Sequence, residues 1–283
     1  MPNIIIIGEN SYIGNAFEAF ARKELNPNIK KISSRNEAWK NENFSQADCV
    51  LFCAGIAHKK AEDELHFAVN RDLAVETAKK AKKEKVPHFI YISSAAVFGN
   101  DGGTVNPRTP PNPRGAYGES KFEAENELKK LSDVNDNGFI LTIVRPPMVY
   151  GAGCKGNFPR LVRLSEIMPL FPDIDNKRSM IYIENLCFFL LGLIEDRRRG
   201  VFFPQNAEYQ STSAIYRQIR EVLGKKSRLT KLFNPFIYFF CNFLSPAQKL
   251  FGDFVYSGSD FEKIDFIGFK TGIKRSVENP RKT

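Results

Sequence analysis

The segment Asn3-Ile-Ile-Ile-Ile-Gly-Glu-Asn-Ser-Tyr-Ile-Gly14 decides the fold of this 283-residue chain. It opens with a short apolar run of β-branched side chains, which predicts a buried parallel strand over residues 3–7. A glycine-rich turn from Gly8 to Gly14 follows, and a helix is expected over residues 12–24. Glycine lets the backbone approach phosphate groups, and the amides and dipole of a helix N-terminus attract an anion. The segment therefore predicts a pyrophosphate cradle, although Ser11 replaces the usual middle glycine.

The rest of the N-terminal half alternates between strand and helix patterns. Further strands are expected at residues 29–32, 48–53, 88–92 and 139–144, and further helices at 61–85 and 117–131. Such alternation predicts an α/β protein with a doubly wound parallel sheet. After residue 150 proline, glycine, phenylalanine and arginine become frequent and the expected helices shorten. We therefore expect a dinucleotide-binding domain over residues 1–150 and a smaller substrate domain over 151–283, with segments that return to the main sheet.

A second chemical signal lies in Tyr117-Gly-Glu-Ser-Lys121. Side chains four residues apart share one face of a helix. An ammonium beside a phenol could lower the phenol pKa by up to roughly 3 units, if burial does not oppose it. Ser93 and Ser94, which follow the strand expected at 88–92, offer a hydroxyl that would hold a substrate oxygen. The pattern predicts a site that transfers a proton near neutral pH.

The end of the second expected strand bears on the choice of dinucleotide. An acidic residue there would bind the ribose 2′-hydroxyl of NAD. This chain instead reads Lys30-Lys-Ile-Ser-Ser-Arg35, without a carboxylate. Ser33, Ser34 and Arg35 suit a 2′-phosphate, so we expect NADP(H) to be preferred, with NAD(H) possible. The alternative is that Arg35 is a solvated loop residue.

Composition excludes several other classes of protein. Hydrophobic content of 42% and charged content of 26% are ordinary for a globular enzyme. The net charge of +9 includes a lysine-rich stretch at residues 79–85, but without interleaved aromatics or a nucleic-acid-binding motif, so no nucleic-acid partner is expected. A basic balance also suits anionic ligands such as a dinucleotide and a sugar nucleotide.

Cysteine and histidine usage points to a cytoplasmic protein without a metal site. The five cysteines are an odd number and form no C-x-x-C motif, which favours structural thiols in a reducing compartment. His58, His66 and His88 lack metal-ligand spacing, and we expect core or surface roles for them. The N-terminal apolar run is short and ends at Gly8, so no signal peptide is expected.

In order and spacing, these motifs resemble the extended short-chain dehydrogenase/reductases, the NAD-dependent epimerase/dehydratase family, over essentially the whole chain. The matching elements are the Gly8 to Gly14 turn, Asn70 in Val-Asn-Arg-Asp-Leu, Ser93-Ser94, the Tyr117/Lys121 pair, Arg145-Pro-Pro-Met-Val-Tyr-Gly151 and Arg178-Ser-Met-Ile-Tyr-Ile-Glu-Asn185. The resemblance implies a Rossmann-type sheet and a homodimer. It also implies that Ser94 is the catalytic hydroxyl, Tyr117 the proton donor and Lys121 its partner.

The same resemblance implies where ligands bind. The residues expected to contact the dinucleotide are Gly8, Ser11, Tyr12, Ile13, Gly14, Ser34, Arg35, Ala54, Gly55, Asn70, Tyr117, Lys121 and Pro146. The residues expected to contact a UDP-linked amino sugar are Ser94, Asn157, Arg160 and Arg178. Arg178 would hold the nucleotide diphosphate, and Arg160 is a second candidate for that diphosphate because guanidinium groups bind phosphates by charge-assisted hydrogen bonds.

The segment from Arg145 to Arg160 is similar to one subgroup that acts in capsule and O-antigen biosynthesis. Members reduce UDP-2-acetamido-2,6-dideoxy-4-keto-hexoses, and others are labelled UDP-hexose 4-epimerases. We expect the reductase, with the 4-epimerase as the first alternative. A second alternative is a non-catalytic NADP(H)-sensing protein, against which the intact Ser94, Tyr117 and Lys121 argue. Dehydration is disfavoured because Ala95 and Ala96, where dehydratases carry an acid pair, cannot move a proton.

One aromatic segment, Phe233-Asn-Pro-Phe-Ile-Tyr-Phe-Phe-Cys-Asn-Phe-Leu244, stands apart from these motifs. It is too short to span a bilayer, which needs about 20 apolar residues. We expect a core helix of the substrate domain or an oligomer interface, and no membrane association. The alternative is a helix lying on a membrane surface.

Overall fold

The computed structural model describes residues 1–35, 37–57, 62–99, 103–106, 108–132, 138–241, 248, 250–258 and 262–278. Of the residues discussed above, His58 and residues 242–244 lie outside this part. The chain divides into two compact units. The first comprises residues 1–99, 110–146 and 187–203, and the second residues 100–109, 147–186 and 204–283.

A six-stranded sheet forms the centre of the first unit. Its strands are β1 (Asn3–Ile7), β2 (Asn28–Ile32), β3 (Cys49–Phe52), β4 (His88–Ile92), β6 (Ile140–Val144) and β10 (Gly200–Phe202). They lie in the order β10-β6-β4-β3-β1-β2, and every neighbouring pair is parallel. The α/β class and the doubly wound sheet are confirmed, and the five expected strands end within one residue of their observed bounds.

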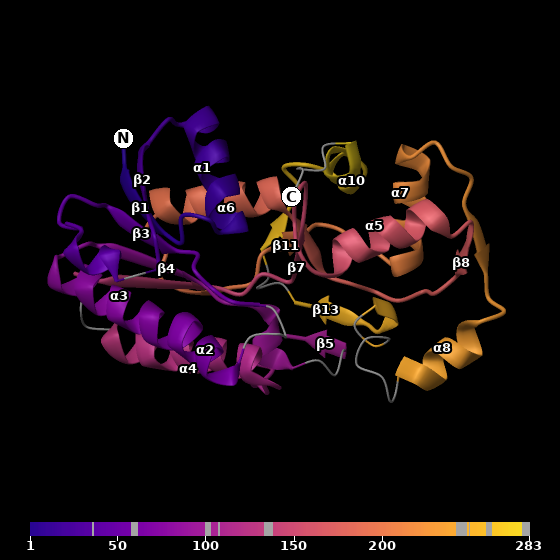
Figure 1. Cartoon of the computed structure of the whole chain (residues 1–283), viewed down its shortest axis with the longest axis horizontal. Coiled ribbons are helices and arrows are strands. Elements are labelled where there is room, and N and C mark those ends of the chain that lie inside the picture. The colour runs from indigo at the N-terminus through magenta and orange to yellow at the C-terminus, as the bar shows by residue number, and fades with distance from the viewer. Residues whose placement is uncertain are drawn as a thin grey trace. The chain divides into compact units, whose positions relative to one another are not determined.

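Helices cover both faces of this sheet. Helix α1 (Tyr12–Glu24) and α6 (Ile183–Glu195) lie on one face, and α2 (Asp63–Phe67), α3 (Leu73–Lys83) and α4 (Ala116–Leu131) lie on the other (Figure 1). Short 3₁₀ turns occur at η1 (Ala38–Asn41) and η3 (Ala95–Phe98). The core beneath α3 and α4 is aromatic and aliphatic, with Phe52, Phe89 and Leu128 fully buried in it. Burial on both faces explains why the central strands β1, β3, β4 and β6 are largely apolar, whereas the edge strand β2 exposes Asn28, Lys30 and Lys31.

The helix expected over residues 61–85 is confirmed for residues 63–83, but it is not a uniform α-helix. A π-helical turn, η2 (Ala68–Asp72), separates α2 from α3. Asn70 lies inside this turn, fully buried, and its side chain bonds to the backbone N and O of Ile56 at 2.9 and 3.1 Å. The Tyr91 hydroxyl donates to the Asn70 carbonyl oxygen at 2.7 Å. Through these hydrogen bonds, Asn70 in the π turn is bound to residues outside the helix. Such π turns are frequent at functional sites.

The second unit is built from short parallel strand pairs and several helices. Its strands are β5 (Gly103–Val105), β7 (Met148–Tyr150), β8 (Leu170–Pro172), β9 (Met180–Tyr182), β11 (Gln205–Asn206), β12 (Arg228–Thr230), β13 (Phe254–Tyr256) and β14 (Lys263–Ile264). Its helices are α5 (Asn157–Ile167), α7 (Thr212–Val222), α8 (Asn234–Cys241) and α10 (Phe269–Glu278). In the described part of the chain, no helix is both long enough and apolar enough to cross a membrane.

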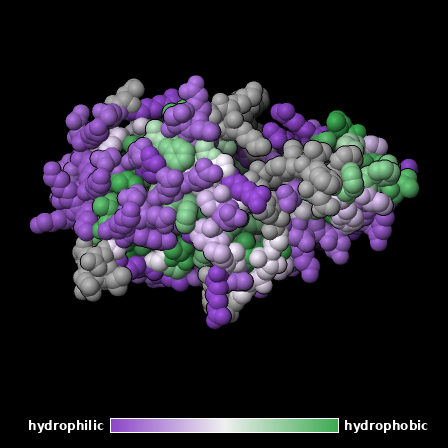
Figure 2. Space-filling view, turned by 90° about the horizontal axis from the view of Figure 1, so that it is seen from below, coloured by the Kyte–Doolittle hydropathy of each residue, from purple (hydrophilic) through white to green (hydrophobic). Residues whose placement is uncertain are grey.

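For the aromatic segment at 233–244 we expected either a core helix or an oligomer interface, and for the residues that the structure describes the core helix is wrong, while the interface stays a prediction. Helix α8 leaves Phe236, Tyr238 and Phe239 exposed. Figure 2 shows hydrophobic side chains gathered at the right-hand end of the view, where α8 lies in Figure 1. The segment therefore forms a surface of the second unit.

Candidate active site

The glycine-rich turn lies where the strand order of the sheet reverses, between β1 and β3. Gly8 follows β1 with φ +105°, and a Cβ at this position would lie 2.8 Å from the backbone N of Ala54, which follows β3. At Gly14 a Cβ would lie 2.9 Å from Cγ2 of Ile6. Side chains here would fill the space next to the helix N-terminus. Ligands of open α/β sheets bind at this kind of crevice, so the turn fits a dinucleotide pyrophosphate.

Ser11, which replaces the usual middle glycine, caps α1. Its Oγ accepts a hydrogen bond from the Gly14 N–H at 3.0 Å. Burial raises the pKa of the Cys53 thiol to about 12, while the Lys121 charge and a hydrogen bond donated by Ser11 to the thiolate oppose that rise. Ser11 thus joins the first turn of α1, where Tyr12 and Ile13 lie, to the end of β3. Ser11 in place of the usual glycine thus preserves the turn and adds a side-chain cap to the N-terminus of α1.

The residues directly after β2 carry no carboxylate. Arg35 is exposed, and its backbone N–H donates to Oγ of Ser33 at 3.3 Å. Ser34 is partly buried. The first unit therefore presents a guanidinium and two hydroxyls at this strand end, which is the set expected for a 2′-phosphate.

Lys121 is buried beside the expected dinucleotide residues. Its Nζ donates to the carbonyl oxygen of Ile92 at 2.8 Å and lies 4.7 Å from the centroid of the Tyr91 ring. A Cβ on Gly55 would lie 3.3 Å from this Nζ and 3.2 Å from Oδ1 of Asn70. Burial lowers the pKa of Lys121 to about 8, opposed by Cys53 and Glu125. The end of β3, the π turn and α4 therefore meet at one ammonium group.

Tyr117 and Ser94 are brought together at the start of α4. Gly118 makes the approach possible, since a Cβ there would lie 2.7 Å from the carbonyl oxygen of Ala96. Burial raises the pKa of Tyr117, and a hydrogen bond donated by Ser94 to the phenolate form opposes that rise. The expectation of a lowered phenol pKa is therefore wrong for this structure, because desolvation outweighs the hydrogen bond from Ser94. Tyr117 therefore holds its proton at neutral pH.

The adjacent serine, Ser93, has a different role. Its hydroxyl donates to Oε1 of Glu125 at 2.5 Å, and the same oxygen accepts from Nε of Arg145 at 2.9 Å. Glu125 is fully buried, and the Arg145 guanidinium lies 5.0 Å from the ring centroid of Phe98. Ser93 is thus part of a buried ionic cluster, which leaves Ser94 as the hydroxyl beside Tyr117. The loop after Ser94 is fixed by a hydrogen bond of 3.0 Å from the Ala95 N–H to the Pro146 carbonyl oxygen.

Sequence reasoning missed two residues of this site, Glu125 and His66. Glu125 follows Lys121 by four positions, so the helical spacing that links Tyr117 to Lys121 could have found it. His66 is buried with its ring centroid 6.2 Å from that of Tyr117 at an interplanar angle of 63°. Its Nδ1 lies 3.1 Å from the carbonyl oxygen of Ile56. No spacing rule connects His66 to Tyr117, because they lie on different helices.

Two of the residues expected to bind substrate meet in the second unit. Asn157, which begins α5, and Arg178 line one small pocket of about 10 Å³ together with Met148, Phe158, Leu161, Thr212, Ile215 and Leu250. The Arg178 guanidinium donates to the carbonyl oxygen of Gly252 at 2.8 Å, and burial lowers the pKa of Arg178. Arg160 is exposed on α5 and does not line this pocket. The structure thus brings Asn157 and Arg178 together, without Arg160.

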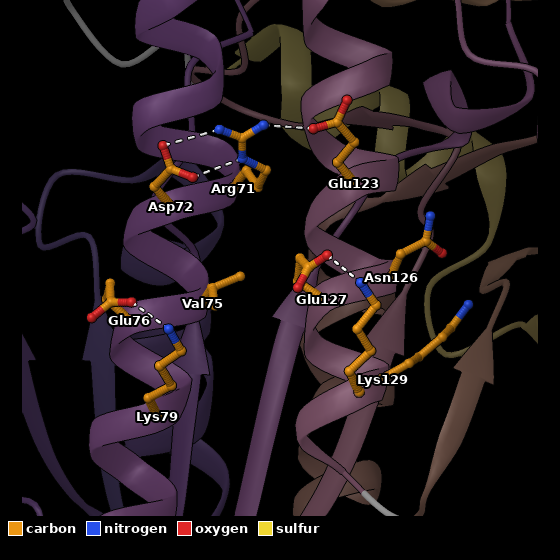
Figure 3. A pocket seen from close by; sticks show the side chains of 10 residues that line it. Arg71, Asp72, Val75, Glu76, Lys79, Glu123, Asn126, Glu127 and Lys129 are labelled. Carbon is orange, nitrogen blue, oxygen red and sulfur yellow. Dashed lines mark hydrogen bonds and ion pairs between the residues drawn. The ribbon is translucent and has the colours of Figure 1, made fainter.

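A larger groove, of about 920 Å³, lies between α3 and α4 and contains none of the expected site residues. Figure 3 shows its charged side chains in pairs. Arg71 donates to Asp72 at 2.7 Å and to Glu123 at 2.6 Å. Lys79 and Lys130 pair with Glu76 and Glu127, three residues before each. These charged side chains form ion pairs with one another, so the groove is a salt-bridged surface of the two helices. We therefore do not place the catalytic site in this groove.

Comparison with known proteins agrees with this geometry. Residues 4–202 match the NAD dependent epimerase/dehydratase family. The chain belongs to that family. The matched region contains the glycine-rich turn, Ser94, Tyr117, Lys121 and Arg178.

Two relatives of this family member carry descriptions of activity. A UDP-glucose 4-epimerase of Vibrio cholerae is 37% identical over 189 residues, which cover 62% of this chain and 57% of that protein. An N-acetyl-alpha-D-glucosaminyl-diphospho-ditrans,octacis-undecaprenol 4-epimerase of Escherichia coli O157:H7 is 25% identical over 244 residues, which cover 79% of this chain and 73% of that protein. The match to the Vibrio cholerae protein thus spans little more than half of its length.

Solved structures share the fold. The Bordetella bronchiseptica enzyme WbmH in complex with NAD+ has a TM-score of 0.77 and 18% identity, covering 99% of this chain and 98% of that chain. A dTDP-4-dehydrorhamnose reductase from Bacillus anthracis in complex with NADP has a TM-score of 0.73 and 19% identity, covering 98% and 99%. At these identities the likeness establishes the fold.

Proposed function

We propose that this chain reduces the C4 ketone of a UDP-2-acetamido-2,6-dideoxy-4-keto-hexose with a reduced nicotinamide dinucleotide, in the synthesis of a surface polysaccharide. The observation that carries the proposal is that a hydrogen bond from Ser94 opposes the rise in the pKa of Tyr117, one helical turn from the buried ammonium of Lys121 on α4. This arrangement suits protonation of an oxygen on a carbon that changes oxidation state. Family membership supports nicotinamide chemistry at that carbon.

Each residue has a separate task in this proposal. The Ser94 hydroxyl holds the C4 oxygen, and Tyr117 gives it a proton as the ketone becomes an alcohol. Lys121 stabilises the phenolate left on Tyr117, because a buried ammonium interacts strongly with a nearby anion. When bound, the reduced nicotinamide supplies the hydride that C4 receives. Gly8, Gly14 and Gly55 let the turn, the first helix and the Lys121 side chain pack closely around the proposed dinucleotide site, since a Cβ at any of them would meet neighbouring protein atoms.

Ligand preference rests on arginines. Arg35, exposed after a β2 end without a carboxylate, supports NADP(H) over NAD(H). Arg178 and Asn157, which line one pocket of the second unit, would hold the UDP portion of the substrate. One N–H of the Arg178 guanidinium donates to the Gly252 carbonyl oxygen. A guanidinium has five N–H donors, so other N–H groups remain to bind a diphosphate. Exposed Arg160 is the weaker candidate for that role.

A second candidate is 4-epimerisation of a UDP-hexose or UDP-N-acetylhexosamine, which the names of the two relatives favour. An epimerase keeps its dinucleotide through the cycle, whereas a reductase consumes it. The name of the Escherichia coli relative also makes a polyprenol-linked diphosphate sugar a substrate class to test. Dehydration stays disfavoured, because Ala95 and Ala96 carry no proton-transferring group.

The proposal is tested by NADPH oxidation with and without the 4-keto sugar nucleotide. We expect oxidation only when the sugar is present, and a loss of about 10²–10⁴-fold in turnover for Tyr117→Phe. Tyr209→Phe is the matched control, because its hydroxyl bonds to the Tyr256 carbonyl oxygen within the second unit. A folded Tyr117→Phe protein with wild-type turnover would contradict the assignment of the proton donor.

A further inference from the structure

An exposed apolar surface lies on and just before helix α8. We define the α8 patch as Leu232, Phe233, Phe236, Tyr238 and Phe239. Leu232 is 74% exposed, Phe236 67% and Phe239 61%, so most of the surface of each residue faces solvent. Large apolar side chains gathered on one surface mark a site of interaction with another molecule or with a membrane.

The segments next to α8 extend this surface. Strand β12 precedes α8 and pairs with β8, which places Leu170 opposite Arg228. Leu170 is exposed, as is Ile167 at the end of α5. Asn234, the first residue of α8, donates from Nδ2 to the carbonyl oxygen of Asp173 at 2.8 Å, which fixes the start of the helix to the residue after β8. The apolar surface is therefore held by a strand pair and a hydrogen bond.

Basic side chains border the α8 patch on the same stretch of chain. Lys226, Arg228 and Lys231 are all exposed, and within the described residues none of them forms an ion pair with a carboxylate. The neighbouring acidic residues are Glu166, Asp173 and Asp175. The cations of the groove between α3 and α4, by contrast, are paired with carboxylates. The border of the patch thus offers three cations without a carboxylate partner among the described residues, alongside the carboxylates of Glu166, Asp173 and Asp175.

We propose that the α8 patch docks this protein on the surface of an anionic phospholipid bilayer. Phenylalanine, tyrosine and leucine side chains would enter the boundary between headgroups and acyl chains, and the three basic side chains would meet anionic headgroups. A second copy fits this surface less well. An isologous dimer brings the same patch of each copy together, so the unpaired cations would face each other. The proposal goes beyond the proposed function and holds whether the enzyme is a reductase or an epimerase.

Vesicle flotation of the full-length protein tests this proposal. Vesicles of phosphatidylcholine with 30% phosphatidylglycerol are compared with pure phosphatidylcholine at about 0.1 M salt. We expect at least about tenfold tighter binding to the anionic vesicles, and weaker binding as salt rises. Phe236→Ser with Phe239→Ser removes the aromatic anchor, and Lys226→Glu with Lys231→Glu reverses the border charge. Each double variant should lose at least about tenfold in affinity.

The matched control is Lys23→Glu with Lys40→Glu, which changes net charge by the same amount on exposed lysines of the first unit. It should bind like wild type. The charge-reversal variant alters surface side chains alone, so it tests the proposal even if the aromatic variant fails to fold. Equal binding by wild type, Lys226→Glu/Lys231→Glu and the control would overturn the proposal. A dimer in light scattering that Phe236→Ser/Phe239→Ser converts to a monomer, without vesicle binding by wild type, would also overturn it.

Discussion

The ammonium nitrogen of Lys121 lies 2.8 Å from the carbonyl oxygen of Ile92, to which it donates a hydrogen bond. This bond holds the lysine at the end of β4, two residues before Ser94. It also ties α4 to the strand whose continuation carries the hydroxyl of Ser94, which we propose to be catalytic. Because the same nitrogen is buried, its charge depends on pH in a range that kinetics can reach.

Activity should therefore fall as pH rises through about 8. The pKa of Lys121 is lowered by burial to about 8, so below that pH the ammonium is charged and above it the charge is lost. The profile of kcat/KM against pH reports groups of the free enzyme. Lys129→Met, two helical turns from Lys121 on α4, should keep this fall, whereas Lys121→Met should remove it together with most of the activity. A flat wild-type profile between pH 7 and about 9.5 would contradict the role of the charge.

The two adjacent serines should behave differently. Ser94→Ala should lower turnover on the order of 10²-fold, with a melting temperature near wild type. Ser93→Ala removes the donor to a carboxylate oxygen that is fully buried, and should cost about 1–3 kcal/mol of unfolding free energy with little loss of turnover in the folded enzyme. Urea unfolding and steady-state kinetics of both variants check this. The reverse pattern would show that Ser93 is the hydroxyl used.

The buried pair of Glu125 and Arg145 should be strongly coupled. Glu125→Ala leaves the guanidinium of Arg145 buried without its carboxylate, which typically costs about 3–5 kcal/mol. Adding Arg145→Met should restore part of that loss, because the uncompensated charge is then gone. Urea unfolding of the two single variants and the double variant gives the coupling. Additive losses would mean that the two residues stabilise the protein independently.

Arg35→Asp should change the preference for the dinucleotide. The substitution replaces a phosphate partner with a charge that repels phosphate and accepts from a ribose hydroxyl. We expect the Kd for NADPH to rise at least about tenfold while the Kd for NADH changes by less than about threefold. Lys23→Asp, on an exposed position of α1, controls for the change in net charge. An unchanged Kd for NADPH would show that Arg35 does not contact the phosphate.

The first sheet could be predicted from sequence because its central strands are buried on both faces. Continuous apolar runs such as Ile4–Ile7 and Cys49–Phe52 are typical of strands buried on both faces. Their alternation with helices predicts a parallel sheet. The π turn at Asn70 could not be predicted, since it depends on bonds to Ile56 and Tyr91 that are distant in sequence. Strand β10 is only three residues long and lies after α6, beyond the range of a local pattern.

The site was predictable where spacing carries information. Tyr117 and Lys121 share a helix face by their spacing, and that spacing extends to Glu125. The phenol pKa was not predictable, because it depends on the balance of burial against charge, which requires the packed structure. Helix α8 shows where sequence patterns mislead about burial. Its aromatic residues read as core, yet they are exposed, because hydrophobicity alone does not say which partner covers a side chain.

The most direct test of the central claim is NMR of the product formed from UDP-2-acetamido-2,6-dideoxy-4-keto-hexose and NADPH. The account predicts one C4 alcohol, with one NADPH consumed for each sugar reduced and no reaction of UDP-glucose or UDP-N-acetylglucosamine. Interconversion of UDP-hexose or UDP-N-acetylhexosamine at C4 without net consumption of the dinucleotide, with the 4-keto sugar left unreduced, would contradict it and establish the epimerase.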